Sequence, residues 1–446
     1  MTAPAGDLVI TDVTVVDGTG AGPRPHADVV VGAGRITAIA AAGGDHGTLP
    51  ALPGHGRYLV PGLWETQAHL TRPGTGQVPD YIFDWPETGS LVPAATALRC
   101  YLHCGVTTVV DLGGPPQMLV PLRGLQADGI ITGARLQLVG KQLTASDSGP
   151  AVNGRFMSSW AQPVADAPAA RDLIQHTVEE YDIAAVKVIY SDTHDMAGPG
   201  PRIHRALLEE IVAEAHRHGR PVIAHCDDSG SAIEAVLGGA DAVEHMFVAP
   251  EGEAERDIDR MIEECAARGT YWSMTIAMWE AWSRLGDPAL LADIGVVGAV
   301  PRCTLDALLH EPDSWWTQPP PVITAMASQL LAQSMTSVAR AFSAGVPMST
   351  STDAGNAVVF HGPAVHREMA LMARAGLAPA DVLQTATRLA AEKFGQGSEI
   401  GTVQPGKIAD LLLLRQDPLT DVAHLRDIER VIIAGIAHDP DALRVT

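Results

Sequence analysis

Two side chains that can bind a metal ion, Gln67 and His69, follow an apolar stretch that begins at Pro61. The stretch is predicted to be a β-strand, and residues two apart on a strand point to the same face. We therefore expect Gln67 and His69 to point together into one site. Imidazole nitrogen is a common metal ligand, whereas an amide oxygen is a neutral and weaker donor.

Four further strand-like segments each carry one more residue of this kind: Lys187, His225, His245 and Asp353. The carboxyl ends of the strands of a barrel meet at one mouth, where active sites form. Imidazole and carboxylate ligands with an open position suit catalytic zinc, and also manganese, iron or nickel. The ordered set of five segments predicts a catalytic metal site at such a mouth.

Lysine is scarce in this chain, and Lys187 stands in the apolar run IAAVKVI at residues 183–189. A buried ammonium without a partner would be costly. Either the side chain reaches water from an edge strand, or it serves the site. The other lysines, Lys141, Lys393 and Lys407, have polar or glycine-containing surroundings and are expected in loops or on the surface.

The two ends of the chain share a pattern of short strands. Residues 7–60 contain apolar strands separated by glycine, aspartate or proline, and residues 409–414 and 431–433 resume the pattern. We therefore predict one small β-sandwich domain built from both termini, residues 1–60 and 396–446.

The middle of the chain, residues 61–395, alternates strand-like and helix-like segments, which implies parallel strands and an α/β fold. Residues 203–218 have apolar residues at helical spacing, with Gly219 as the stop signal. The length suits a catalytic (β/α)8 TIM barrel. A doubly wound sheet is the alternative, disfavoured because no GxGxxG follows a first strand. The proline-rich residues 283–321 are expected to form a long loop, a candidate lid.

The bulk composition excludes some classes of partner. The formal net charge of −22 disfavours binding to nucleic acid or anionic membrane. We find no signal-peptide pattern and no apolar run of about 20 residues, so no membrane association is expected. The five cysteines form no CxxC pair and are odd in number, which favours a reducing, cytoplasmic location.

Together these segments resemble the metal-dependent amidohydrolases. The first strand is similar to the family's Pro-Gly-Leu-Ile-Asp-x-His-x-His, with Gln67 in place of the first histidine. Supporting segments are GVTTVVDLGG at 105–114, AH at 224–225, VEH at 243–245, TDAG at 352–355 and GTVQPGKIAD at 401–410. The chain resembles the imidazolonepropionase-like branch, which includes Xaa-Pro dipeptidase and ochratoxinase relatives, over nearly its whole length.

The resemblance implies a site for one or two divalent metal ions, with zinc as the first expectation. Carbon dioxide would carbamylate Lys187, and the carbamate would bridge the metals. His225 and His245 would hold one ion with that carbamate. His69 and Asp353 would hold the other, aided in the family by the residue at position 67. A metal-bound hydroxide would attack a carbonyl, with Asp353 as general acid and base beside His245 in the catalytic centre.

Two departures from the family pattern bear on this chemistry. Gln67 is expected to weaken one metal site, which leaves a single tight metal as one prediction and two bound metals as the other. Residues 143–149, LTASDSG, lack the Gly-Gly-His of many relatives, whose histidine assists the substrate carbonyl. His361 and His194 are the expected substitutes, with His103 as a further alternative. Tyr190, after the strand of Lys187, is also expected to contact the substrate.

Tryptophan is enriched after the seventh predicted strand, at positions 272, 279, 282, 315 and 316. Some of these rings could line a site for a bulky apolar substrate, and core packing explains the others. The resulting prediction is a hydrolase that cleaves a C–N bond (amide, lactam or cyclic imide) of a small apolar or aromatic substrate. A metal-assisted cyclase, dehydratase or decarboxylase and a non-catalytic scaffold are the alternatives, and a homo-oligomer is expected from the resemblance.

Overall fold

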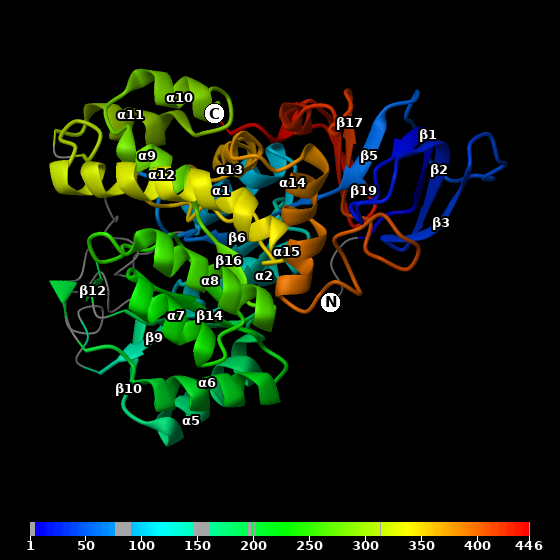
Figure 1. Ribbon diagram of the computed structural model, residues 1–446. Coiled ribbons are helices and arrows are strands. Elements are labelled where there is room, and N and C mark those ends of the chain that lie inside the picture. Colours follow the sequence, from blue (N-terminus) through cyan, green and yellow to red (C-terminus); the bar gives the residue numbers. More distant parts are fainter. Residues whose placement is uncertain are drawn as a thin grey trace.

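The structure is a computed structural model that describes residues 5–75, 91–146, 148, 160–191, 193–194, 198–199, 201–312 and 314–445. A small all-β part, coloured blue and red, lies beside a larger part in which helices and strands alternate (Figure 1).

Strands from both ends of the chain pair in one sheet. Its members are β1 (Leu8–Val15), β2 (Arg24–Gly32), β3 (Arg35–Ala41), β4 (Ala51–Pro53), β5 (Tyr58–Pro61), β17 (Leu411–Leu414), β18 (Ile428–Ile433) and β19 (Ile436–His438). The order is β19-β18-β17-β5-β1-β2-β3, with β4 paired to β1. Leu411 faces Pro61 and Leu414 faces Tyr58 in the antiparallel pair that joins the two ends. The two ends thus form one β unit, and its arrangement as a two-layer sandwich stays a prediction.

Two parallel sheets lie in the larger part. One contains β6 (Leu63–Ala68), β7 (Val106–Asp111) and β8 (Arg135–Leu138). The other runs β10-β9-β11-β14-β15-β16, with bounds Ala161–Val164, Gln142–Ala145, Val186–Ile189, Val222–His225, Ala242–Glu244 and Tyr271–Ser273. Residues 346–354 bond to both sheets: Trp272 N donates to Pro347 O at 3.1 Å, and Thr66 N donates to Thr350 O at 3.2 Å. This mixed α/β arrangement fits a TIM-barrel-like fold.

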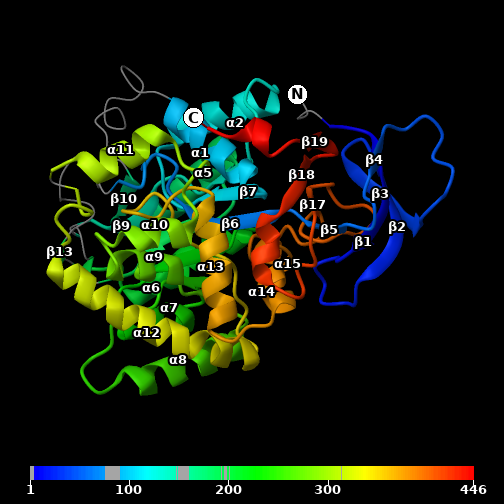
Figure 2. The same ribbon diagram turned by 90° about the horizontal axis from the view of Figure 1, so that it is seen from above.

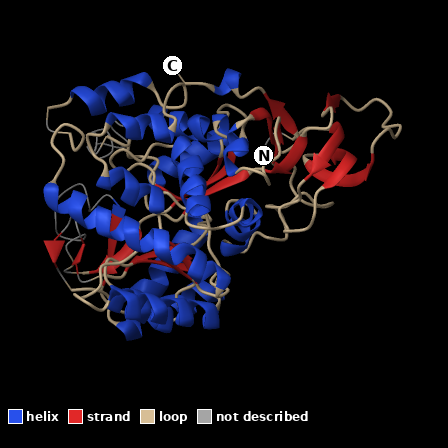
Figure 3. Ribbon diagram, turned by 45° about the horizontal axis from the view of Figure 1, so that its top comes forward, coloured by secondary structure: helices blue, strands red, loops and turns tan. Residues whose placement is uncertain are grey.

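Helices lie around these parallel strands, whereas the small part is almost wholly strands and loops (Figures 2 and 3). The helices are α1 (Val92–His103), α2 (Pro116–Ala127), α5 (Ala167–Tyr181), α6 (Arg205–Arg217), α7 (Ser229–Leu237), α8 (Ala254–Arg268), α9 (Ile276–Ser283), α10 (Pro288–Ile294), α11 (Arg302–His310), α12 (Pro321–Ser343), α13 (Pro363–Arg374), α14 (Pro379–Thr385) and α15 (Arg388–Lys393). Short elements are β12 (Thr193–His194), β13 (Gly198–Pro199), η2 (Val422–Arg426) and η3 (Asp441–Leu443). Among the described helices, none has both the length and the hydropathy needed to cross a bilayer.

Helix α6 confirms the helix predicted over residues 203–218. It begins after His204, whose ring Nδ1 accepts a hydrogen bond from Leu207 N at 3.1 Å. Its apolar face, which includes Leu208 and Ile211, is buried. The helix ends just before Gly219, whose φ of +66° is the left-handed conformation that stops helices.

The expectation of a long loop over residues 283–321 is wrong. The segment contains α10 and α11 and ends at the start of α12. Asp287 caps α10, because its side chain accepts a hydrogen bond from Ala289 N at 3.0 Å. Pro288 occupies the first turn, where proline starts a helix because the N–H it lacks would have no partner there. Three prolines of this segment therefore mark helix starts: Pro288 begins α10, Pro301 precedes α11 and Pro321 begins α12.

The surface placement expected for Lys393 is also wrong. Lys393 ends α15 with its side chain buried, and its Nζ lies 2.5 Å from Glu244 Oε1 on β15. Ser349 Oγ accepts a further hydrogen bond from Nζ at 3.3 Å. A buried carboxylate therefore compensates the ammonium, and it comes from a strand about 150 residues earlier in the chain.

Candidate active site

Strand β6, the first strand of the larger part, brings polar side chains into the interior at every second position. Glu65, Gln67 and His69 are all buried. The amide Nε2 of Gln67 lies 3.3 Å from Nε2 of His245 at the end of β15. His69 Nε2 lies 3.1 Å from Asp353 Oδ1. The alternation expected of a strand therefore places Gln67 and His69 in one site with His245 and Asp353.

The contact between His69 Nε2 and Asp353 Oδ1 requires either a proton or a metal ion between the two atoms. His69 Nδ1 lies 3.0 Å from the carbonyl oxygen of Gly113 and must donate to it. A neutral imidazole that donates from Nδ1 has only a lone pair at Nε2. That lone pair would face a carboxylate oxygen at 3.1 Å, two acceptors in contact. Either a second proton on the ring or a metal ion between the two atoms satisfies this geometry.

The other two histidines are also held through one ring nitrogen each. His245 Nδ1 lies 3.0 Å from Thr275 Oγ1, so its Nε2 points toward Gln67. His225 Nε2 lies 2.9 Å from Asp227 Oδ1, within ion-pair distance. The two rings lie edge to face with their centroids 4.8 Å apart. Histidine ligands of metals are oriented by outer partners in this way.

Lys187 on β11 is buried, and its Nζ has no hydrogen-bond partner within the described residues. Burial lowers the pKa of Lys187 to about 8, while the charges of Glu244 and Asp353 oppose the shift. About a tenth of the amine is therefore neutral at pH 7, far more than for an ordinary lysine, and the neutral amine is the form that attacks carbon dioxide. An orphaned buried nitrogen calls for a physical explanation, and conversion to a ligand provides one.

Protonation states at the site suit cation binding. Burial opposes ionisation of Asp353, but the hydrogen bond and charge of His69 hold its pKa below the ordinary value. Burial and the neighbouring His225 lower the pKa of His245 to about 3, so its ring is neutral near pH 7. Asp353 and His245 also have positive φ angles, +58° and +74°. Left-handed backbone of this kind costs about 1–3 kcal/mol per residue and clusters at functional sites.

The ligand candidates lie in pairs. Within the described residues, no group of three or more histidine, cysteine, aspartate or glutamate side chains forms a ready-made metal site. His69 pairs with Asp353, and His225 packs on His245. The donor types, the acceptor–acceptor contact and the orphaned Lys187 Nζ nevertheless fit a divalent cation.

A profile of the amidohydrolase family matches residues 58–437, most of the chain. The chain belongs to the amidohydrolase family. The predicted family and the prediction of a hydrolytic enzyme of amidohydrolase type are thereby confirmed. A search of curated proteins gave no significant match.

Solved structures of similar fold match this chain over nearly its whole length. A Xaa-Pro dipeptidase with methionine bound in its active site has a TM-score of 0.75 at 20% identity, covering 97% of this chain and 100% of its own. A putative prolidase from Bifidobacterium longum has a TM-score of 0.75 at 22% identity, covering 99% and 98%. Phenylurea hydrolase B has a TM-score of 0.74 at 22% identity, covering 98% and 97%. At these identities the likeness shows the fold.

The side chains predicted to contact the substrate are, where the structure describes them, engaged with other groups of the protein. His361 is buried with both ring nitrogens engaged: Nε2 lies 2.8 Å from Arg72 O, and Nδ1 lies 3.1 Å from Tyr101 Oη. Tyr190 is three residues from Lys187, and its ring faces Arg202, whose guanidinium carbon lies 5.0 Å from the centroid. An odd spacing on a strand gives opposite faces. His103 Nδ1 donates to Pro440 O at 2.7 Å, and the side chain of His194 lies outside the described residues.

Several polar residues at the site were missed from the sequence. Glu65 accepts hydrogen bonds from Gln67 N at 3.0 Å and Thr352 N at 3.1 Å. Burial raises its pKa to about 8. Glu65 is two residues before Gln67, and Asp227 is two residues after His225. The alternation that placed Gln67 and His69 on one face could therefore have pointed to both. Arg72 NH1 donates to Asn356 Oδ1 at 2.7 Å, and no sequence signal pointed to it.

The tryptophan cluster divides into two parts. Trp279, Trp282 and Trp315 form a series that leads away from His245, with successive ring centroids 6.3, 5.8 and 5.3 Å apart. Trp272 instead stacks on Phe247 and donates from Nε1 to His245 O at 2.9 Å. Trp316 lies in the main core. One branch thus borders the site, and the other supports the backbone of His245.

Replacing Thr275 with valine should weaken metal binding about 10- to 100-fold, the usual effect of losing an outer partner of a histidine ligand. Valine keeps the shape of threonine but leaves His245 Nδ1 without its partner at 3.0 Å. Titration with a chromophoric chelator measures the affinity. The control Thr275→Ser keeps the hydroxyl and should bind as the wild type does. Equal affinity of the valine and wild-type proteins would contradict this role.

Proposed function

We propose that this protein is a metal-dependent hydrolase that cleaves a C–N bond of an amide, lactam or cyclic imide. The observation that carries the proposal is the convergence of His69, Asp353, Gln67 and His245 in one buried site, with His69 Nε2 3.1 Å from Asp353 Oδ1 and Gln67 Nε2 3.3 Å from His245 Nε2. The buried Lys187 Nζ, without a partner in the described chain, supports it. In this proposal the parallel strands form a closed (β/α)8 barrel with the site at its mouth.

The residues divide into two candidate ligand sets. His225, His245 and the carbamate of Lys187 would hold one divalent ion, and His69, Asp353 and Gln67 would hold the second. Zinc is the first candidate, with manganese, iron or nickel as the others. A bound divalent ion supplies Lewis acidity and lowers the pKa of water. Asp353, ionised and buried, would accept the proton of the attacking water and deliver it to the leaving nitrogen.

The substrate class follows from the side chains near His245. Trp279 is buried with its ring centroid 6.3 Å from that of His245, and Trp282 and Trp315 continue the series. An aromatic neighbour of this kind suits a small apolar or aromatic substrate. The name of phenylurea hydrolase B, one of the proteins of similar fold, refers to an aromatic urea. A panel of aryl amides, aryl ureas, cyclic imides and Xaa-Pro dipeptides tests the class.

Oxygen-18 water tests hydrolysis itself. Turnover of any panel member should place one labelled oxygen in the carboxylate or carbamate product. Product that forms without label would favour the alternative of a cyclase, dehydratase or decarboxylase. No turnover of any panel member by protein with bound metal would count against the proposed substrate class.

Replacing Gln67 with histidine should strengthen the second metal site. Gln67 offers one neutral oxygen, and in the present arrangement its amide nitrogen faces His245 while Ser351 Oγ donates to its oxygen at 3.3 Å. Imidazole nitrogen binds zinc better than an amide oxygen does. We expect bound metal to rise from near one to near two per chain, measured by inductively coupled plasma mass spectrometry. Gln67→Asn is the matched control, and an unchanged ratio in Gln67→His would contradict the assignment.

A further inference from the structure

A cavity of about 540 Å³ lies away from the candidate active site, between the larger part and the small β unit. Arg135 begins β8, Ile183 precedes β11 and Arg220 precedes β14. The cavity therefore opens at the amino ends of these strands, whereas His225 is the last residue of β14. Its other wall comes from Ile433, Ile436 and His438 of β18 and β19.

Three arginines and one carboxylate line this cavity in a chain whose net charge is −22. Arg123 donates to two backbone carbonyls, of Tyr181 at 2.6 Å and of Asp182 at 3.1 Å. Arg220 NH2 pairs with the Asp182 carboxylate at 2.7 Å. Arg135 NH2 pairs with Asp410 at 3.2 Å. Each of the other two arginines is paired with a carboxylate, whereas Arg123 bonds only to neutral carbonyls in these contacts. Arg123 therefore gives the cavity a net positive charge.

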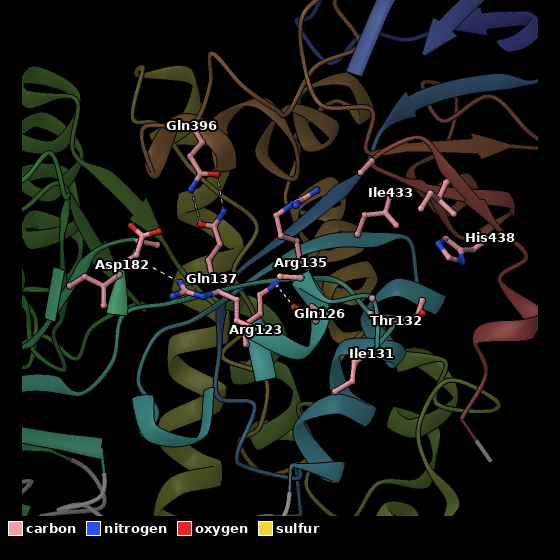
Figure 4. A pocket seen from close by; sticks show the side chains of 18 of the residues that line it. Arg123, Gln126, Ile131, Thr132, Arg135, Gln137, Asp182, Gln396, Ile433 and His438 are labelled. Carbon is pink, nitrogen blue, oxygen red and sulfur yellow. Dashed lines mark hydrogen bonds between the residues drawn. The ribbon is translucent and has the colours of Figure 1, made fainter. Parts of the chain in front are cut away.

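Two donors in this wall are buried without an acceptor in the described chain. They are the Nε atoms of Arg135 and Arg220. A buried unpaired donor costs about 1–3 kcal/mol. The two side chains are nevertheless 30% and 29% exposed, so atoms of these side chains other than Nε are the ones that a ligand in the cavity could meet. Arg135 lies between Asp182 on one side and Ile433 and His438 on the other (Figure 4).

The rest of the lining is apolar or already bonded. Ile131, Leu136, Ile183, Ile433 and Ile436 supply aliphatic surface. The amides of Gln137 and Gln396 bond to each other at 2.8 and 2.9 Å. Burial lowers the pKa of His438, so its ring is neutral near pH 7. Cations on one side and aliphatic carbon on the other match a molecule with an anionic end and an apolar body.

We propose that this cavity is a second ligand site that takes a small organic carboxylate with an apolar body. The carboxylate would lie against Arg123 and Arg135, and the apolar body against Ile433 and Ile436. The volume is in the range of small-molecule sites, about 300–1,000 Å³. The site does not depend on the proposed metal chemistry.

Four probes of matched shape or charge test the proposal by isothermal titration calorimetry on the full-length protein. Benzoate should bind, while benzamide lacks the charge, and acetate and inorganic phosphate lack the apolar body. We expect the last three to bind at least about tenfold more weakly than benzoate. Arg123→Gln should weaken benzoate binding about tenfold or more, and Arg123→Lys should weaken it less.

Two further measurements keep this test separate from the candidate active site. Lys187→Ala should bind benzoate as the wild type does. Crystals soaked with 4-bromobenzoate should give a bromine anomalous peak between Arg123 and Ile433. A peak only at the mouth, no peak at all, equal binding of benzoate and benzamide, or loss of binding in Lys187→Ala would each overturn the proposal.

Discussion

Lys187→Ala is expected to lower kcat/KM by about a thousandfold or more and to remove most bound metal. In the proposed function a carbamate on Lys187 would help to hold the metal, and loss of metal activation would forfeit several kcal/mol, where each 1.4 kcal/mol is a factor of ten. The variant should nevertheless fold, because the side chain removed makes no hydrogen bond in the described structure. Added acetate or propionate should restore part of the activity and metal by occupying the place of the carbamate.

Lys393→Met is the matched control, since Lys393 is the other buried lysine of the described chain. It pairs with Glu244 at 2.5 Å, and breaking a buried ion pair costs about 3–5 kcal/mol of stability. We expect a lowered midpoint of thermal unfolding and no rescue by acetate. In wild-type protein equilibrated with ¹³C-bicarbonate, a carbamate carbon resonance should appear that Lys187→Ala lacks. Full activity of Lys187→Ala without added acid would refute the carbamate role.

Asp353→Asn should lower kcat by about 10²- to 10⁴-fold, the usual contribution of a positioned general acid or base. Asparagine keeps an oxygen near His69 but cannot accept the proton. Because its pKa lies below the ordinary value, Asp353 is ionised throughout the range above its usual pKa of about 4. The wild-type rate should therefore show no loss from this group until the pH falls below that value.

Asp227→Asn serves as the comparison for Asp353. Asp227 lies 2.9 Å from His225 Nε2 and acts through that ring. Its replacement should lower metal affinity about 10- to 100-fold, and excess metal should restore most of the rate. Rates for Asp353→Asn should stay low at any metal concentration. An Asp353→Asn protein with wild-type kcat on the substrate found in the panel would remove Asp353 from the mechanism.

The periodicity of the sequence was sufficient to predict features that depend on residues of the same helix or strand. The period of 2 along β6 brought Gln67 and His69 to one face, and helical spacing gave α6 with its stop at Gly219. The likeness of β-rich patterns at the two ends also anticipated the pairing of β5 with β17. These features depend on interactions within a few residues or on composition.

Contacts between segments far apart in the chain could not be predicted from the sequence pattern. Lys393 looked like a surface residue because its partner, Glu244, lies on another strand. Tyr190 was predicted to contact the substrate, and this stays a prediction. In the structure its ring faces Arg202, which lies on a separate segment. His361 is engaged by Arg72 and Tyr101, two partners from separate segments. Burial and long-range partners, which decide these roles, leave no trace in local sequence.

The metal content per chain is the first measurement to make on the proposed metal-dependent hydrolase. The measurement is inductively coupled plasma mass spectrometry on protein purified without added metal or chelator. We expect about one tightly bound divalent ion per chain, because Gln67 weakens the second set of ligands. A value near zero that added zinc, manganese or iron does not raise would contradict a metal-dependent hydrolase built on His69, His225, His245 and Asp353.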